Sequence, residues 1–83
     1  MQPVLTAHAR ARMQQRGIAP EALEELLDLG RETFDHRGHA TILYFGAEAR
    51  RRLGRRRARL YAVLSHDGEV ITVGWRRRRI ARS

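Results

Sequence analysis

Apolar side chains at the start of the chain follow the repeat of a helix. They recur every four residues, at Leu5, Ala9 and Met13, and residues four apart lie on the same side of a helix. This spacing predicts a helix over about 7–16. Thr6 is suited to cap its first turn by accepting a backbone N–H, and Gly17 to adopt the left-handed conformation that ends many helices.

A second helix is predicted over 20–29. Pro20 suits its first position, where the missing N–H costs nothing, and Gly30 is expected to end it. Between them the leucines fall mainly on one side, whereas the acidic residues fall on the other: Glu21, Glu24, Glu25 and Asp28. We therefore expect the apolar side to face the core and the acidic side to face solvent.

Beyond Gly30 the apolar repeat shortens to two residues, which is typical of strands. Four strands are predicted, over 31–35, 40–45, 59–65 and 70–76. Asp67-Gly68 predicts a two-residue type I′ turn between the last two, with the following opposed pairs: Leu60 and Trp75, Ala62 and Val73, Leu64 and Ile71. The sequence thus predicts an α+β fold, with two N-terminal helices packed on one face of an antiparallel sheet of about four strands.

Length and composition narrow the class of protein. A chain of 83 residues suits a single domain, 1–83. It has no cysteine, which excludes disulfides, zinc–thiolate sites and a cysteine nucleophile. No apolar run approaches the roughly 20 residues of a membrane span, and the first residues lack the apolar region of a signal peptide. We expect a cytoplasmic protein that is not bound to a membrane.

The formal net charge of +8 is concentrated in the second half of the chain. Residues 1–49 hold five arginines and seven acidic residues, whereas residues 50–83 hold twelve arginines and two acidic residues. We predict a basic loop at about 46–57, with a short helical turn over 47–53 as the alternative, and a basic C-terminal tail at 76–83. Such a distribution indicates an anionic partner, and the candidate nucleic-acid-binding residues are Arg16, Arg55, Arg56, Arg57, Arg59, Arg76, Arg77, Arg78 and Arg79.

His8, Arg12 and Arg16 are spaced four apart, along the rim of the apolar side of the first helix. Such residues are commonly structural, the imidazole forming a hydrogen bond and the arginine stem covering apolar surface. A functional interpretation is that the imidazole exchanges a proton near neutral pH while the arginines hold a phosphate through paired donors. RNA cleavage through the 2′-hydroxyl needs such an acid or base and cations, but no metal. Tyr61 is either an exposed strand residue or a group that stacks on a base or passes a proton.

The other histidines are His36, His39 and His66, all at predicted turns, where we expect them to be exposed and without a role. The His36–His39 pair has no third ligand nearby, so no metal site is predicted. The sequence has no glycine-rich phosphate loop and no nucleophile elbow. No cofactor is expected.

The segment from His8 to Ile18 reads H-A-x-x-R-M-x-x-R-G-I. It resembles the opening helix of a bacterial family, domain-of-unknown-function family 4258, which is related to the RelE/ParE-like toxins. The order of the elements, a second helix followed by an antiparallel sheet, is similar over most of the chain. The resemblance implies a RelE-like fold and, indirectly, a ribonuclease activity, and it carries over only His8, Arg12 and Arg16.

Three functions are compatible with these observations. The first is a RelE-like toxin, or a toxin-derived RNA-binding protein, that acts as a metal-independent endoribonuclease. Its catalytic residues would be His8, Arg12 and Tyr61, and its partners RNA or the ribosome and an acidic antitoxin. The second is a non-catalytic nucleic-acid-binding module, and the third a domain that docks on an acidic protein. We favour the first.

Overall fold

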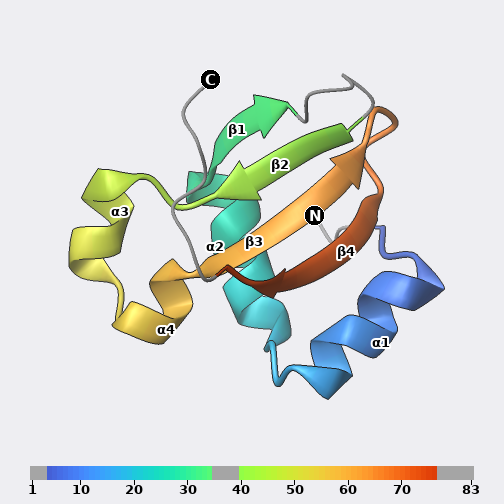
Figure 1. The fold of residues 1–83 in the computed structure, drawn as a ribbon, viewed down its shortest axis with the longest axis horizontal. Helices are drawn as coiled ribbons and strands as arrows, with labels where there is room; N and C mark the ends of the chain where they lie inside the picture. The colour runs from blue at the N-terminus through green and yellow to red at the C-terminus, as the bar shows by residue number, and fades with distance from the viewer. Residues whose placement is uncertain (1–3, 35–39, 77–83) are drawn as a thin grey trace.

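The computed structural model describes residues 4–34 and 40–76. The elements follow one another as α1 (Ala7–Gln15), α2 (Pro20–Leu29), β1 (Arg31–Phe34), β2 (Ala40–Tyr44), α3 (Ala47–Arg52), α4 (Arg55–Ala58), β3 (Leu60–Ser65) and β4 (Val70–Trp75). The strands form one antiparallel sheet in the order β1-β2-β3-β4 (Figure 1). The predicted α+β fold is confirmed. The turn predicted at 36–39 and the tail at 77–83 lie outside the described residues.

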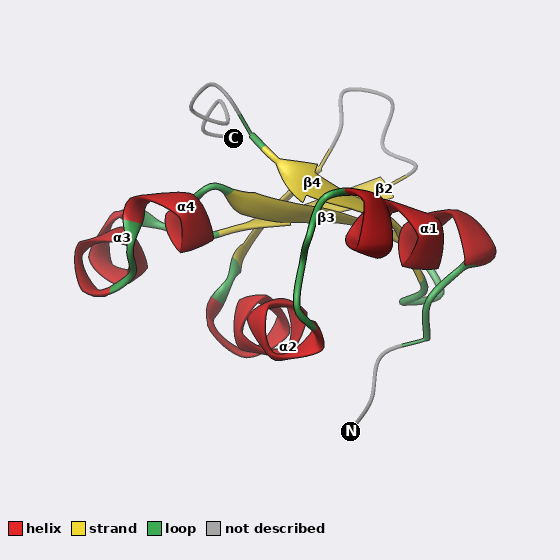
Figure 2. Ribbon diagram, turned by 90° about the horizontal axis from the view of Figure 1, so that it is seen from below, coloured by secondary structure: helices red, strands yellow, loops and turns green. Residues whose placement is uncertain are grey.

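The two N-terminal helices share one core with the sheet. α2 lies beneath the sheet, and α1 lies beside β4 at the sheet edge (Figures 1 and 2). Their apolar residues meet those of three strands in one buried cluster: Ala9, Met13, Ile18, Ala22, Leu23, Leu26, Leu43, Phe45, Leu60, Ala62, Val70 and Val73. Each large side chain buried here stabilises the fold by about 1.5–3 kcal/mol relative to an exposed one.

The other side of the sheet is the open face, which we define as the face opposite α2. The strand register assigns to it Arg31, Thr33, Ala40, Ile42, Tyr44, Tyr61, Val63, Ser65, Thr72 and Gly74. No described helix covers this face (Figure 2). Because none of these positions is acidic, the open face differs in charge from the exposed side of α2.

The turn between β3 and β4 is not the predicted type I′ turn. Only glycines have positive φ among the described residues, Gly68 at +89°, whereas type I′ needs positive φ at both central positions. The Gly68 N–H donates to Ser65 O at 2.9 Å and the Ser65 N–H to Glu69 O at 2.8 Å. These bonds enclose a three-residue loop that ends in a left-handed glycine.

The longer turn shifts the register by one residue, and a β-bulge restores it. Leu64 pairs with Val70 and not with Ile71 as predicted, and Ile71 is the extra residue before Val63 pairs with Thr72. The two predicted pairs nearer the other end of the hairpin, Leu60 with Trp75 and Ala62 with Val73, are confirmed.

The N-terminal segment pairs with β4 at the bulge. The Val70 N–H donates to Val4 O at 2.8 Å, and the Thr6 N–H donates to Val70 O at 3.1 Å. The Thr6 hydroxyl donates to Ile71 O at 3.0 Å and accepts the Ala9 N–H at 3.1 Å. Thr6 is therefore the predicted cap, and it also fixes the start of α1 to the sheet edge.

The segment predicted as a basic loop at 46–57 instead contains α3 and α4. Alanine and arginine are good helix formers, and Ala49 and Leu53 pack against the core cluster. Most of the arginine side chains extend into solvent, so their mutual repulsion does not prevent a helical turn. Gly54 separates the two helices and precedes the first residue of α4.

Candidate nucleic-acid interface

His8 and Arg12 contact each other on α1, as their spacing predicts. Arg12 Nε donates to His8 Nε2 at 3.4 Å, on an exposed part of the helix. His8 Nε2 therefore accepts this bond through its lone pair and lies beside a guanidinium. No described hydrogen bond links either residue to Tyr61, so the three catalytic candidates are not joined in one cluster.

Arg16, at the end of the same row, reaches the open face. Its Nη1 lies 3.5 Å from Val73 O and occupies the space where a side chain at Gly74 would lie. The Tyr61 ring and hydroxyl border the same space, at 3.0 Å from the position of a Cβ on Gly74. Gly74 therefore lets the guanidinium and the phenol of two distant elements lie together.

Tyr61 belongs to a row that crosses all four strands. In the register Arg31 is opposite Tyr44, Tyr44 is opposite Tyr61, and Tyr61 is opposite Gly74. The Arg31 side chain packs over Gly46, with Nε 2.8 Å from the position of a Cβ there. We call Arg31, Tyr44, Tyr61 and Gly74, together with Arg16, the tyrosine row. It presents two half-buried phenol rings with an arginine at each end, over three strand spacings or about 14 Å; the Arg31 side chain also borders the space beside α3.

Charge is divided between the two sides of the sheet. The acidic side of α2 holds exposed Glu21, Glu24 and Asp28, and α2 lies on the side opposite the open face (Figure 2). The fourth acid, Glu25, forms an ion pair with Arg57, Oε1 to Nη1 at 2.8 Å. An anion is therefore attracted toward the open face and its rim and repelled from α2.

The arginines of α4 have different environments. Arg57 forms an ion pair with Glu25, so the positive charge of Arg57 is largely neutralised before any ligand binds. Arg56 lies over the Trp75 ring, 4.8 Å from its centroid, and its Nη2 donates to Arg16 O at 3.3 Å. Arg55 is exposed and forms no ion pair with a described residue.

The remaining arginine candidates lie where β3 begins and β4 ends. The Arg76 N–H donates to Arg59 O at 2.7 Å, which extends the hairpin by one pair. Arg76 is half-buried and its Nη2 donates to Ala58 O at 3.4 Å, whereas the Arg59 side chain is exposed. The other three candidates, Arg77, Arg78 and Arg79, lie outside the described residues.

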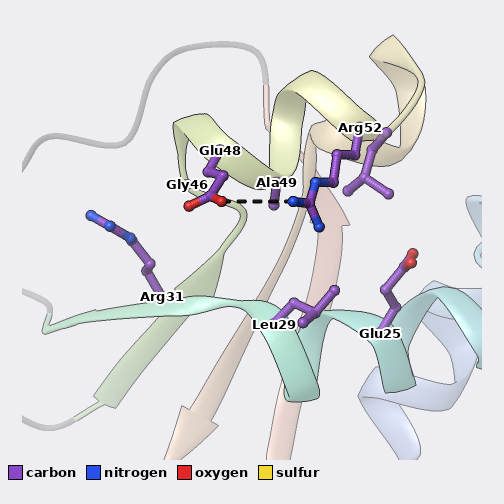
Figure 3. Close-up of a pocket in the computed structure, with 8 residues that line it drawn as sticks. Glu25, Leu29, Arg31, Gly46, Glu48, Ala49 and Arg52 are labelled. Carbon is purple, nitrogen blue, oxygen red and sulfur yellow. Dashed lines mark ion pairs between the residues drawn. The ribbon is translucent and has the colours of Figure 1, made fainter.

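A cavity of about 480 Å³ lies between the end of α2 and α3 (Figure 3). Two acids and two arginines line it, with apolar residues between them: Glu25, Leu29, Arg31, Gly46, Glu48, Ala49, Arg52 and Leu53. Arg52 and Glu48 form an exposed ion pair at 3.8 Å, drawn as the dashed line in Figure 3. Two acidic residues of its lining, Glu25 and Glu48, make this cavity less suited to an anion than one lined by arginines alone.

Sequence reasoning missed four residues of this region: Gly74, Tyr44, Trp75 and Glu25. A glycine inside a strand often marks a close approach of another group, and the predicted pairs Leu60 with Trp75 and Ala62 with Val73 place Gly74 opposite Tyr61, so the sequence does carry a signal for Gly74. The Glu25–Arg57 pair spans 32 residues and has no local signal. Trp75, predicted opposite Leu60, packs against the core, and its indole Nε1 also donates to Arg16 O at 2.9 Å.

No protein-family model, curated protein or solved structure matches the chain. None of the helices in residues 4–34 and 40–76 is long and apolar enough to cross a membrane. Over the same residues no three histidine, cysteine or acidic side chains are grouped so as to hold a metal ion. His36 and His39 lie outside the described residues.

Proposed function

We propose that this protein is a RelE-like RNA-binding domain that holds single-stranded RNA across the open face of its sheet. The tyrosine row is the observation that carries the proposal. Unpaired bases stack on aromatic rings, and guanidinium groups bind phosphate through paired donors. Arg31 and Arg16 flank Tyr44 and Tyr61 in that way. The resemblance of the α1 motif to a RelE-related family supports the same conclusion.

The aromatic pair favours a single strand over a duplex. In a duplex the bases are already stacked inside the helix and their faces cannot reach a flat sheet. A duplex would use only the arginines, and its affinity would not depend on Tyr44 or Tyr61. As a RelE-like protein it would act in the cytoplasm on free or ribosome-bound RNA, and an acidic antitoxin would compete for the same basic surface.

The test is the affinity of a fluorescently labelled single-stranded RNA for tyrosine variants, measured by anisotropy. Stacking contributes about 1–3 kcal/mol per base, so Tyr44→Leu and Tyr61→Leu should each weaken binding roughly 5- to 150-fold. Phe34→Leu is the matched control, because Phe34 is an exposed aromatic of β1 that belongs to the other face of the sheet. Equal losses in all three variants, or none in any, would contradict the proposal.

Cleavage of the bound RNA is a second candidate function, favoured by the His8–Arg12 contact. An imidazole next to a phosphate-binding guanidinium combines the proton-exchanging group and the cation that 2′-hydroxyl activation requires. His8→Ala should then lower the cleavage rate by roughly 10²–10⁴-fold, with RNA affinity and melting temperature unchanged because the side chain is exposed. His66→Ala, an exposed histidine in the β3–β4 turn, is the control. Cleavage that survives in His8→Ala removes His8 from the mechanism.

A further inference from the structure

A second cavity, of about 450 Å³, lies where the turn after α1 meets α4 and the end of β4. Its lining combines small residues, three arginines and the tryptophan: Gly17, Ala19, Ala22, Gly54, Arg55, Arg56, Arg57 and Trp75. None of these lining residues is acidic. In this it differs from the cavity beside α3, which two glutamates line, and its volume is within the usual range for sites that hold small molecules.

Charge and shape at this cavity suit one nucleotide. Arg55 has no partner among the described acids, so its guanidinium is available to a phosphate. The Arg56 guanidinium covers the Trp75 ring with one face, and the other face of such a plane can stack on a base. Gly17, Ala19 and Ala22 also line the cavity, and their side chains are small.

The cavity is adjacent to the tyrosine row. Gly74 belongs to the open face and its neighbour Trp75 to the opposite face. Arg16 connects the two, because its guanidinium lies over Gly74 while its carbonyl oxygen accepts bonds from Trp75 and Arg56. An RNA strand that lies on the open face can therefore pass the end of β4 and place its next base on the opposite face of the sheet.

We propose that this cavity binds a single unpaired nucleotide, with its base stacked on Arg56 above Trp75 and its phosphate held by Arg55. The inference rests on the proposed function, since it gives one nucleotide of the bound RNA a separate site. It also makes a claim of its own, which is that a free nucleoside monophosphate binds there without the rest of the strand.

Trp75 makes the test specific, because it is the one tryptophan of the chain. Adenosine 5′-monophosphate is titrated against indole fluorescence, with adenosine and inorganic phosphate as controls at equal ionic strength. We expect a saturable change with the nucleotide, and binding of adenosine or phosphate at least about tenfold weaker, because each lacks one of the two contacts. An equal response to inorganic phosphate would reduce the cavity to an anion site and overturn the proposal.

Arg56→Lys keeps the charge and removes the planar group, so it should weaken nucleotide binding roughly 5- to 150-fold. Arg51→Lys, an exposed α3 residue that does not line the cavity, should leave it unchanged; equal effects of the two substitutions would overturn the proposal. Far-ultraviolet circular dichroism checks that both variants fold.

RNA binding measured by anisotropy separates the cavity proposal from the RNA-binding proposal. If RNA binds but the nucleotide does not, the cavity proposal alone fails, and if only the nucleotide binds, the RNA-binding proposal alone fails.

Discussion

Replacing Gly74 by alanine should displace Arg16 from the open face and weaken RNA binding. The new Cβ would collide with Arg16 Nη1 and lie 3.0 Å from the Tyr61 ring and hydroxyl. The guanidinium is the end of a flexible side chain, and its bond to Val73 O, at 3.5 Å, is at the limit of hydrogen bonding. Arg16 can therefore move away at little cost, whereas the ring must shift by a few tenths of an ångström.

The expected change in stability is small. Overpacking typically costs about 1–3 kcal/mol, and the loss of glycine freedom in the unfolded chain returns about 0.4–1 kcal/mol. For Gly74→Ala we therefore expect a loss of about 0–2.6 kcal/mol. A loss of 1 kcal/mol in a domain of this size lowers the melting temperature by about 4–8 °C, which a thermal melt resolves.

The expected effect on binding is the loss of one phosphate contact. Each contact with a single strand adds about −0.7 to the slope of log affinity against log salt. The wild type should therefore lose about 2.6-fold more affinity than Gly74→Ala between roughly 50 and 200 mM salt. Arg16→Gln should flatten the slope by the same amount. Arg10→Gln, an exposed arginine on another side of α1, should have less effect.

The double variant decides whether the two residues act together. If Gly74 matters because it admits the Arg16 guanidinium, the double variant should bind RNA no more weakly than Arg16→Gln alone, which is strong non-additivity. Additive losses in Gly74→Ala, Arg16→Gln and the double variant would refute the reasoning. So would an unchanged salt slope in Gly74→Ala.

Two further predictions concern the elements that hold α1 in place. Thr6→Ala removes the cap and the bond to Ile71 O, and should cost about 0.5–2 kcal/mol, seen in chemical denaturation; Thr6→Ser, which keeps the hydroxyl, should retain most of it. Gly17→Ala puts a side chain at φ +63°, and should destabilise the fold by about 1–2 kcal/mol. A melting temperature for Gly17→Ala at or above that of the wild type would contradict the strain argument.

The sequence predicts those elements whose cause is local. α2 has its predicted bounds because Pro20, an amphipathic repeat and Gly30 all lie within the segment itself. The type I′ turn predicted between β3 and β4 was wrong, and the observed hairpin has a bulge where Val70 pairs with Val4 and Thr6, more than 60 residues away. Local turn preferences cannot include that pairing, so the bulge at Ile71 was not predictable from them.

The residues of the candidate site could be predicted from the sequence, but their arrangement in space could not. The His8–Arg12 contact follows from helical spacing alone. The approach of both Arg16 and Tyr61 to Gly74 depends on where α1 lies against β4, which tertiary packing decides. Similarly, the arginines of 55–57 look equivalent in sequence, yet one binds Glu25, one covers Trp75 and one is exposed. Only the fold distinguishes them.

The most direct test of RNA binding on the open face is to map backbone amide resonances by NMR during titration with a single-stranded RNA. The proposal predicts that the largest shifts occur in β2, β3 and β4 around Tyr44, Tyr61 and Gly74, with little change at Glu24 and Asp28 on the acidic side of α2. Shifts concentrated along α2 or at Phe34, or no shifts at low salt, would contradict it.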